Sequence, residues 1–130
     1  MSIFSKKQTG DIGEDYAVKY LKKHGYKIIE RNYRKKIGEI DIIAKRHDYL
    51  VFVEVKTRHC NPLTQPYEAV NLGKQRKIIK TAALYIAEHK LQTYMRFDVC
   101  EVYVDAGTLK LNKINYIKNA FERSDYDSYY

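Results

Sequence analysis

The chain has 130 residues, of which 45% are hydrophobic and 31% are charged, a composition typical of one soluble globular domain. The formal net charge is +8, from 24 Lys and Arg against 16 Asp and Glu, which favours a polyanionic partner, nucleic acid before membrane. No apolar run is long enough to cross a membrane and no signal peptide precedes the first polar segment, so we expect a cytoplasmic protein. The two cysteines stand far apart, without the spacing of a zinc site.

A first helix is predicted after a loose basic arm of residues 1–8. Thr9 or Asp11 would cap this helix, and it would end just before Gly25, which supplies the left-handed stop. Glu14 lies one turn before the apolar stripe, so it shares the face that packs on the sheet. It is either a partner of the helix dipole in the first turn or a third acidic group that reaches toward the site described below.

A first strand is predicted over residues 26–33, where isoleucines and tyrosines recur. It leads into three consecutive cations, Arg34, Lys35 and Lys36. These cations form either a solvated turn or a set of phosphate contacts beside the site.

Residues 38–56 organise the rest of the chain. Two runs of β-branched and aromatic residues flank a polar break that is too short for a helix, which indicates two antiparallel strands joined by a tight hairpin. With the turn centred on His47 and Asp48, Asp41 lies across from Glu54 on the same face of the sheet. A three-residue turn would instead place these two carboxylates on opposite faces.

Facing carboxylates on a mostly apolar hairpin repel each other, so they need a cation between them or a raised pKa on one of them. Lys56 projects from the same face as Glu54 and would lie opposite Glu39. The group is either a divalent-metal site with a lysine beside it or a solvated salt-bridge cluster of little energetic value. Ile43 and Phe52 share this face, which argues against a solvated cluster, but the pattern alone leaves both readings open.

A loop that contains both prolines is predicted from Thr57 to Pro66, and loops of this length are often functional. A second helix is predicted from about Gly73 to His89. Cations in its first turns oppose the helix macrodipole, so helix stability does not explain them. They indicate either a helix end that faces phosphate or a solvated charged face. These cations are Lys74, Arg76, Lys77 and Lys80.

The last part of the chain is predicted to hold a strand over residues 96–104 and a short edge strand over residues 108–111. A helical turn or two over residues 115–121 would then dock on the core. Residues 1–123 form a single domain in this prediction, and residues 124–130 form a disordered tail. The expected fold class is α/β, a central mixed sheet flanked by helices in the order α-β-β-β-α-β.

Several short blocks of the sequence resemble the YraN family of bacterial proteins. These blocks are Gly13-Glu14, Asn32-Tyr33-Arg34, Gly38 to Ala44, Phe52 to Arg58, Lys74-Gln75 and Arg96 to Val99. Members of this family resemble the PD-(D/E)XK, or restriction-endonuclease-like, superfamily, and especially archaeal Holliday-junction resolvases. Ile40 stands where the superfamily's first motif often has proline.

The resemblance implies metal-assisted hydrolysis of phosphodiester bonds with Mg²⁺, or Mn²⁺, as cofactor. Asp41, Glu54 and the backbone carbonyl of Val55 would hold the metal, and Glu14 would bind it directly or through water. Lys56 would orient or help deprotonate the attacking water and stabilise the transition state. The candidate nucleic-acid contacts are Arg34, Lys35, Lys36, Arg58, Lys74, Arg76 and Lys77.

Three functions are compatible with the sequence. The first is a Mg²⁺-dependent endonuclease that acts on branched or otherwise structured DNA, and the second is a nucleic-acid-binding module with the same fold and little turnover. The third is an adaptor protein whose charge is incidental, which the intact acid–acid–lysine set argues against. DNA is favoured over RNA as the partner, read by shape because no base-reading element is evident. A homodimer is left open.

Overall fold

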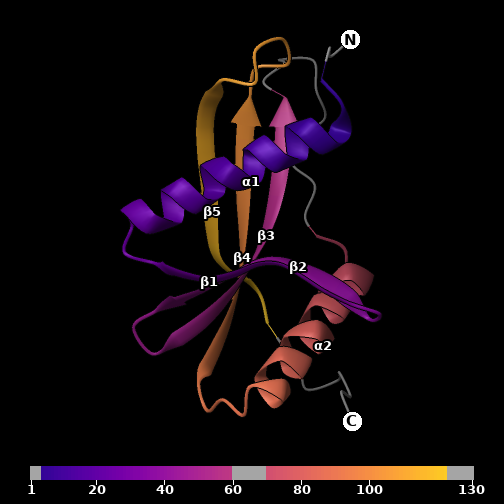
Figure 1. The fold of residues 1–130 in the computed structure, drawn as a ribbon, viewed down its shortest axis with the longest axis vertical. Coiled ribbons are helices and arrows are strands. Elements are labelled where there is room, and N and C mark those ends of the chain that lie inside the picture. Colours follow the sequence, from indigo (N-terminus) through magenta and orange to yellow (C-terminus); the bar gives the residue numbers. More distant parts are fainter. Residues whose placement is uncertain (1–3, 60–69, 123–130) are drawn as a thin grey trace.

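The computed structural model describes residues 4–59 and 70–122 (Figure 1). Its elements follow the order α-β-β-β-α-β-β, which confirms the α/β class and is consistent with a restriction-endonuclease-like fold. The elements are α1 (Lys6–Lys23), β1 (Lys27–Lys35), β2 (Gly38–Arg46), β3 (Tyr49–His59), α2 (Leu72–Glu88), β4 (Tyr94–Val104) and β5 (Leu111–Phe121).

The five strands form one mixed sheet in the order β1-β2-β3-β4-β5. Only β3 and β4 run parallel, and α2 makes the crossover between them. The two helices cover opposite faces of the sheet, since alternate residues of β3 pack with different helices: Phe52 lies in the cluster that contains α2 side chains, and Val53 in the cluster that contains α1 side chains. Figure 1 shows α1 lying across β3, β4 and β5.

The first helix begins earlier than the sequence pattern suggested. Ser5, rather than Thr9 or Asp11, is its N-cap, and Ser5 and Gln8 form a reciprocal capping box. Residues 5–8 are therefore part of an ordered helix start and not a loose arm, and its first turn contains no acidic residue. The predicted stop is confirmed, because Gly25 has a φ of +88°.

The hairpin register is confirmed. Arg46 pairs with Tyr49 across a two-residue turn, and the ladder continues to Ile42 opposite Val53. His47 has a φ of 53°, a left-handed conformation that the favoured two-residue hairpin turns require at their first central position. The recorded pairing between β2 and β3 ends at Ile42 and Val53, so the predicted pairs Asp41–Glu54 and Glu39–Lys56 both lie beyond the hydrogen-bonded ladder.

The C-terminal region differs most from the prediction. Residues 115–121 are not helical: they belong to β5, which pairs antiparallel with β4 from Leu111 to Phe121 with two shifts of register. The spacing of Ile117 and Phe121 suits a helix, but pairing with the open edge of β4 decides the outcome, as tertiary context commonly does. Residues 57–59 likewise extend β3 and do not start a loop.

The remaining predictions concern residues outside the described ranges. The rest of the proline-containing loop, over residues 60–66, and the predicted tail over residues 124–130 both lie there. None of the helices in the described part of the chain is long and apolar enough to span a membrane.

Candidate active site

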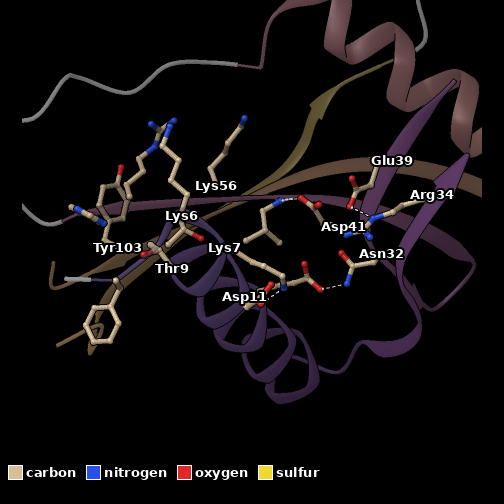
Figure 2. A pocket seen from close by; sticks show the side chains of 17 residues that line it. Lys6, Lys7, Thr9, Asp11, Asn32, Arg34, Glu39, Asp41, Lys56 and Tyr103 are labelled. Carbon is tan, nitrogen blue, oxygen red and sulfur yellow. Dashed lines mark hydrogen bonds and ion pairs between the residues drawn. The ribbon is translucent and has the colours of Figure 1, made fainter. Parts of the chain in front are cut away.

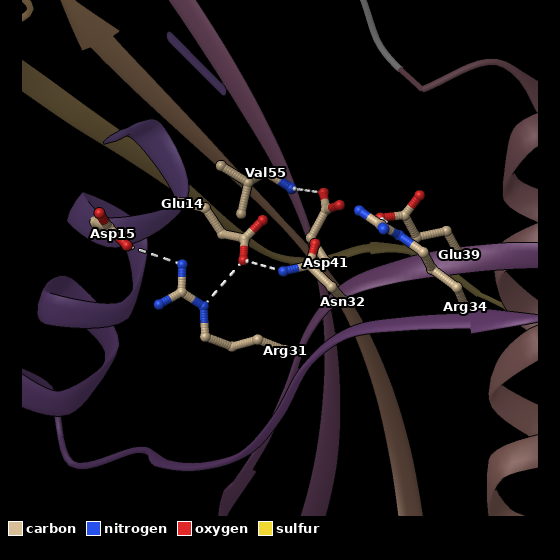
Figure 3. Close-up of polar contacts among 8 residues, drawn as sticks. All are labelled: Glu14, Asp15, Arg31, Asn32, Arg34, Glu39, Asp41 and Val55. Atoms are coloured by element: carbon tan, nitrogen blue, oxygen red, sulfur yellow. Dashed lines mark hydrogen bonds and ion pairs between the residues drawn. The ribbon is translucent and has the colours of Figure 1, made fainter. Parts of the chain in front are cut away.

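The site is centred on the point where β2 separates from β3. The backbone pairing of β2 with β3 ends at Ile42 and Val53. The next contact between the two strands is made by a side chain: Oδ2 of Asp41 accepts a hydrogen bond of 2.8 Å from the backbone N–H of Val55 (Figure 3). The carboxylate is thereby fixed against β3. Figure 3 also shows Glu14 reaching toward Asp41 from α1.

Asp41 and Glu54 are brought together as the hairpin register predicts. The pKa of Asp41 is raised to about 8, first because burial penalises the charged form and then because the neighbouring Glu54 carboxylate interacts with it and repels its charge. Glu14 adds a smaller repulsion, and the hydrogen bond from Val55 acts in the opposite direction. The two carboxylates therefore form a desolvated acidic pair at the separation of the strands.

The cation beside this pair comes from a different element than the sequence suggested. Lys74, in the first turn of α2, places its Nζ 3.2 Å from Oε2 of Glu54. This contact is close enough for an ion pair but is not aligned as a hydrogen bond, and Oε2 of Glu54 is buried without a hydrogen-bond partner among the residues that the structure describes. A cation in the first turn of α2 is therefore explained by its ion pair with Glu54, a residue far away in the sequence.

Lys56 lies next to this ion pair and lines a neighbouring cavity. Its pKa is lowered, first by burial and then by the nearby Lys74 ammonium, while Glu54 acts in the opposite direction. A lysine in this setting gives up its proton more readily than one in water.

Glu14 is the third predicted acidic residue, and it is buried against β1. Oε1 of Glu14 accepts two hydrogen bonds of 2.9 Å, from Nε of Arg31 and from Nδ2 of Asn32 (Figure 3). Because α1 begins at Lys6, Glu14 lies in its third turn, so a role as first-turn dipole partner is excluded. Glu14 also lines the cavity that contains Asp41, as the other reading, an acidic group that faces the site, requires.

Two residues that hold Glu14 were not among the predicted site residues. Arg31 also pairs with Asp15, at 2.9 Å, and Asn32 has a φ of 54°, within a strand. Asparagine adopts this left-handed conformation more easily than most residues, and strained backbone tends to occur at functional sites. The signal in the sequence was that Asn32 belongs to one of the blocks that resemble the YraN family.

A close approach between α1 and β3 sets the depth of Glu14. A Cβ atom added to Gly13 would lie 1.8 Å from Oγ1 of Thr57, so only glycine fits here. This contact brings the helix backbone onto β3 next to Val55 and Lys56.

A cavity of about 950 Å³ opens beside Asp41, Val55 and Lys56 (Figure 2). Its walls come from the start of α1, from β1 and β2, and from the last residues of β3, and Tyr103 of β4 closes one end. Glu54 does not line this cavity. The lining cations are Lys6, Lys7, Arg34, Lys56 and Arg58.

The predicted nucleic-acid contacts are spread over more than one surface. Arg34 lines the cavity and pairs with Glu39 at 3.1 Å, and Arg58 lines it and pairs with the fully buried Glu101, also at 3.1 Å. Lys35 instead pairs with Glu88 of α2, at 3.2 Å. The other predicted contacts do not line the cavity: Lys36 lies in the turn before β2, Lys74 lies beside Glu54, and Arg76 and Lys77 are exposed on α2.

Lys6 and Lys7 are cavity residues that the sequence reasoning missed. They were assigned to a loose arm because Thr9 and Asp11 were taken as the caps. The pattern Ser-Lys-Lys-Gln over residues 5–8 is a capping-box signature and could have placed both lysines on the first turn of α1.

The acidic residues do not form a complete metal cage. Within residues 4–59 and 70–122, no group of three or more His, Cys, Asp or Glu side chains is arranged to hold a metal ion. Glu14 is committed to Arg31 and Asn32, which leaves Asp41 and Glu54 as the carboxylate pair. Two carboxylates, one with an unsatisfied oxygen, fit Mg²⁺, which is commonly bound by one or two carboxylates together with waters and substrate phosphates.

Comparison with known proteins shows the family. The model of the uncharacterised protein family UPF0102 matches residues 13–102, a range that includes all four predicted acid and lysine residues. A UPF0102 protein of Caldanaerobacter subterraneus subsp. tengcongensis is 49% identical over 122 residues, covering 93% of this chain and 100% of that protein. A UPF0102 protein of Clostridioides difficile strain 630 is 50% identical over 118 residues, covering 90% of this chain and 99% of its own length. The chain therefore belongs to the UPF0102 family, which confirms the resemblance to YraN proteins.

Proposed function

We propose that this protein is a Mg²⁺-dependent endonuclease that hydrolyses phosphodiester bonds of DNA, with branched or otherwise structured DNA as its substrate. The observation that carries the proposal is the desolvated carboxylate pair of Asp41 and Glu54, of which Asp41 lines a cavity that also contains several lysines and arginines. A carboxylate with a raised pKa in a concave site, such as Asp41, is typical of catalytic centres.

Asp41, Glu54 and the carbonyl of Val55 are the groups that would hold the cation. Burial and mutual repulsion make the two carboxylates costly as free anions, and a divalent ion relieves both effects. When bound, such an ion would act as a Lewis acid toward a phosphate oxygen and make a coordinated water more acidic. Glu14 would add negative charge from α1, held in place by Arg31 and Asn32.

Lys56 would act on the reacting groups and not on the cation. Lys56 lines the cavity, so its ammonium would lie near a phosphate of a substrate bound there and would stabilise the charge that builds up in the transition state. Its lowered pKa also suits a group that orients the attacking water or accepts a proton from that water.

The cavity supports a phosphate-rich substrate. Lysines and arginines from α1, β1 and β3 line it, and the protein carries a net charge of +8. Contacts of this kind position a nucleic-acid backbone without reading bases, so we expect selection by DNA shape.

The proposal is tested with purified protein, Mg²⁺ or Mn²⁺, and a panel of linear, flapped and four-way DNA substrates. The wild type should cleave a structured substrate, Glu54→Gln should abolish cleavage, and Lys56→Met should reduce it. A ligand that binds only the folded state at 100 times its Kd stabilises that state by about 2.7 kcal/mol, so saturating metal should raise the melting temperature of the wild type and of Lys56→Met. Cleavage by Glu54→Gln at the wild-type rate would remove the acidic pair from the mechanism.

A nucleic-acid-binding module without turnover is the second candidate, and one observation favours it. Lys74 already provides a positive charge beside Glu54, so this carboxylate has a counter-ion without a metal. In that case the wild type would bind structured DNA in the presence and absence of metal, and no substrate of the panel would be cleaved.

A further inference from the structure

Glu54 and Lys74 form an ion pair whose two members are very differently exposed. The Glu54 side chain is 9% exposed, whereas the Lys74 side chain is 45% exposed. The ammonium can therefore move into water at little cost, but the carboxylate cannot follow it. If Lys74 leaves, Glu54 needs another cation.

The backbone that carries Lys74 is fixed, so its side chain can move alone. The Asn71 side chain caps α2 by accepting a 2.9 Å hydrogen bond from the Lys74 N–H, and Nε2 of Gln75 donates to the carbonyl of Val70 at 2.8 Å. A lysine has a long, flexible stem with several rotatable bonds. Rotation of that stem is enough to take Nζ away from Glu54.

The position of Lys74 is unfavourable except for this carboxylate. A cation in the first turn of a helix opposes the macrodipole. The ion pair with Oε2 of Glu54, at 3.2 Å, offsets this cost. Lys74 is thus held in place by a carboxylate of the pair that would bind a metal.

We propose that Lys74 is the resident counter-ion of the acidic pair and that a divalent cation must displace its ammonium from Glu54 in order to bind. The inference rests on the proposed metal site of Asp41 and Glu54. Because Lys74 and the metal compete for Glu54, removing Lys74 should strengthen metal binding. If Lys74 only helped to hold the site together, its removal would weaken metal binding or leave it unchanged. The displaced ammonium is then free to contact a phosphate of bound nucleic acid, which couples metal binding to substrate binding.

The first experiment measures Mn²⁺ affinity by titration, with free Mn²⁺ detected by electron paramagnetic resonance, and involves no activity assay. Lys74→Met should bind Mn²⁺ at least about fivefold more tightly than the wild type, a coupling within the usual range. Lys80→Met is the matched control, because Lys80 is an exposed lysine of α2 and its loss removes the same charge. It should stay close to the wild-type affinity.

Lys74→Met affinity that is equal to or weaker than the wild-type value would overturn the inference, as would an equal gain in Lys80→Met. If the wild type binds Mn²⁺ and Lys74→Met binds it no better, only the counter-ion role fails. If neither protein binds Mn²⁺, the counter-ion role and the proposed metal site fail together.

A second measurement uses the wild type alone, since loss of Lys74 leaves Glu54 uncompensated and could impair folding. Amine-reactive labelling followed by peptide mass spectrometry reports how freely each lysine reacts. Saturating Mg²⁺ should increase the labelling of Lys74 and leave that of Lys80 unchanged. Unchanged or decreased labelling of Lys74 would contradict its displacement.

Discussion

Two buried carboxylates of the same sheet, Asp98 and Glu54, have opposite surroundings. Asp98 is fully buried, and both of its oxygens are satisfied by Nε and Nη2 of Arg96, by the Tyr116 hydroxyl at 2.6 Å and by the backbone N–H of Asn119 at 2.9 Å. Glu54 has one ion pair and an oxygen without a hydrogen-bond partner in the described part of the chain.

The two residues are almost neighbours, which makes the difference informative. Asp98 pairs with Val53 across the parallel strands, so Glu54 is only one residue further along β3 and points to the other face. Both side chains are buried carboxylates, and the completeness of their partner sets differs most. A closed set of partners is typical of a structural group, whereas an incomplete set suggests a place for a ligand.

The largest change in stability is expected at the closed cluster, formed by Asp98 with its partners Arg96, Tyr116 and Asn119. Asp98→Asn removes the charge that compensates Arg96 inside the protein, and breaking a buried pair in this way costs about 3–5 kcal/mol of unfolding free energy. Urea unfolding with linear extrapolation measures this loss. Asp11→Asn serves as the control, because its ion pair with Lys7 is exposed on α1 and is worth at most about 1 kcal/mol. A loss at Asp98 as small as the loss at Asp11 would erase the distinction between the closed and open clusters.

The open cluster, formed by Asp41 and Glu54, should give the opposite result: replacing its aspartate by asparagine should raise the free energy of unfolding. The pKa of Asp41 is raised to about 8 from an ordinary value of 3.8, so the folded protein holds a proton that the unfolded chain releases between these pH values. Its stability therefore falls as pH rises from about 4 to 8 and stays reduced above that range. Asp41→Asn removes this penalty and still offers an oxygen to the Val55 N–H.

With a metal chelator present, Asp41→Asn should be more stable than the wild type at pH 9, by at least about 1.4 kcal/mol, the equivalent of one pKa unit. The two proteins should converge as the pH falls well below 3.8, where Asp41 is protonated in both states. Chemical denaturation at several pH values measures the difference. A variant that is less stable than the wild type at pH 9 would show that Asp41 is a structural group like Asp98.

The hairpin and the acidic pair could be predicted because local chemistry determines them. A two-residue turn at His47 and Asp48 fixes the register, and the register fixes which side chains face each other. The position of Glu14 followed from helical periodicity in the same way. What these predictions needed was one short stretch of chain and one helix face.

The features that were missed depend on contacts between distant segments. Lys74 reaches Glu54 from α2, and β5 forms because β4 offers an open edge; no local pattern encodes either contact. The separation of β2 from β3 beyond Ile42 is also a tertiary feature, and it is what turns Asp41 into a partner of Val55. The early start of α1 is different, since the capping box at Ser5 was visible in the sequence.

The smallest effect on stability is expected at the rim of the cavity. A variant there can be tested for DNA binding without a change in folding that would complicate the result. Arg34 and Glu39 line the cavity as an ion pair whose side chains are 70% and 43% exposed, and exposed pairs contribute little to folding. Arg34→Gln should leave the unfolding free energy nearly unchanged.

If Arg34 contacts a phosphate, its loss should reduce the slope of log affinity against log salt concentration for duplex DNA by about 0.9. Fluorescence anisotropy over a salt series measures the slope, with Lys118→Gln as the control, because Lys118 is exposed on β5 and does not line the cavity. Equal slopes for Arg34→Gln and Lys118→Gln would mean that DNA does not enter the cavity beside Asp41, and the positive charge there would need another explanation.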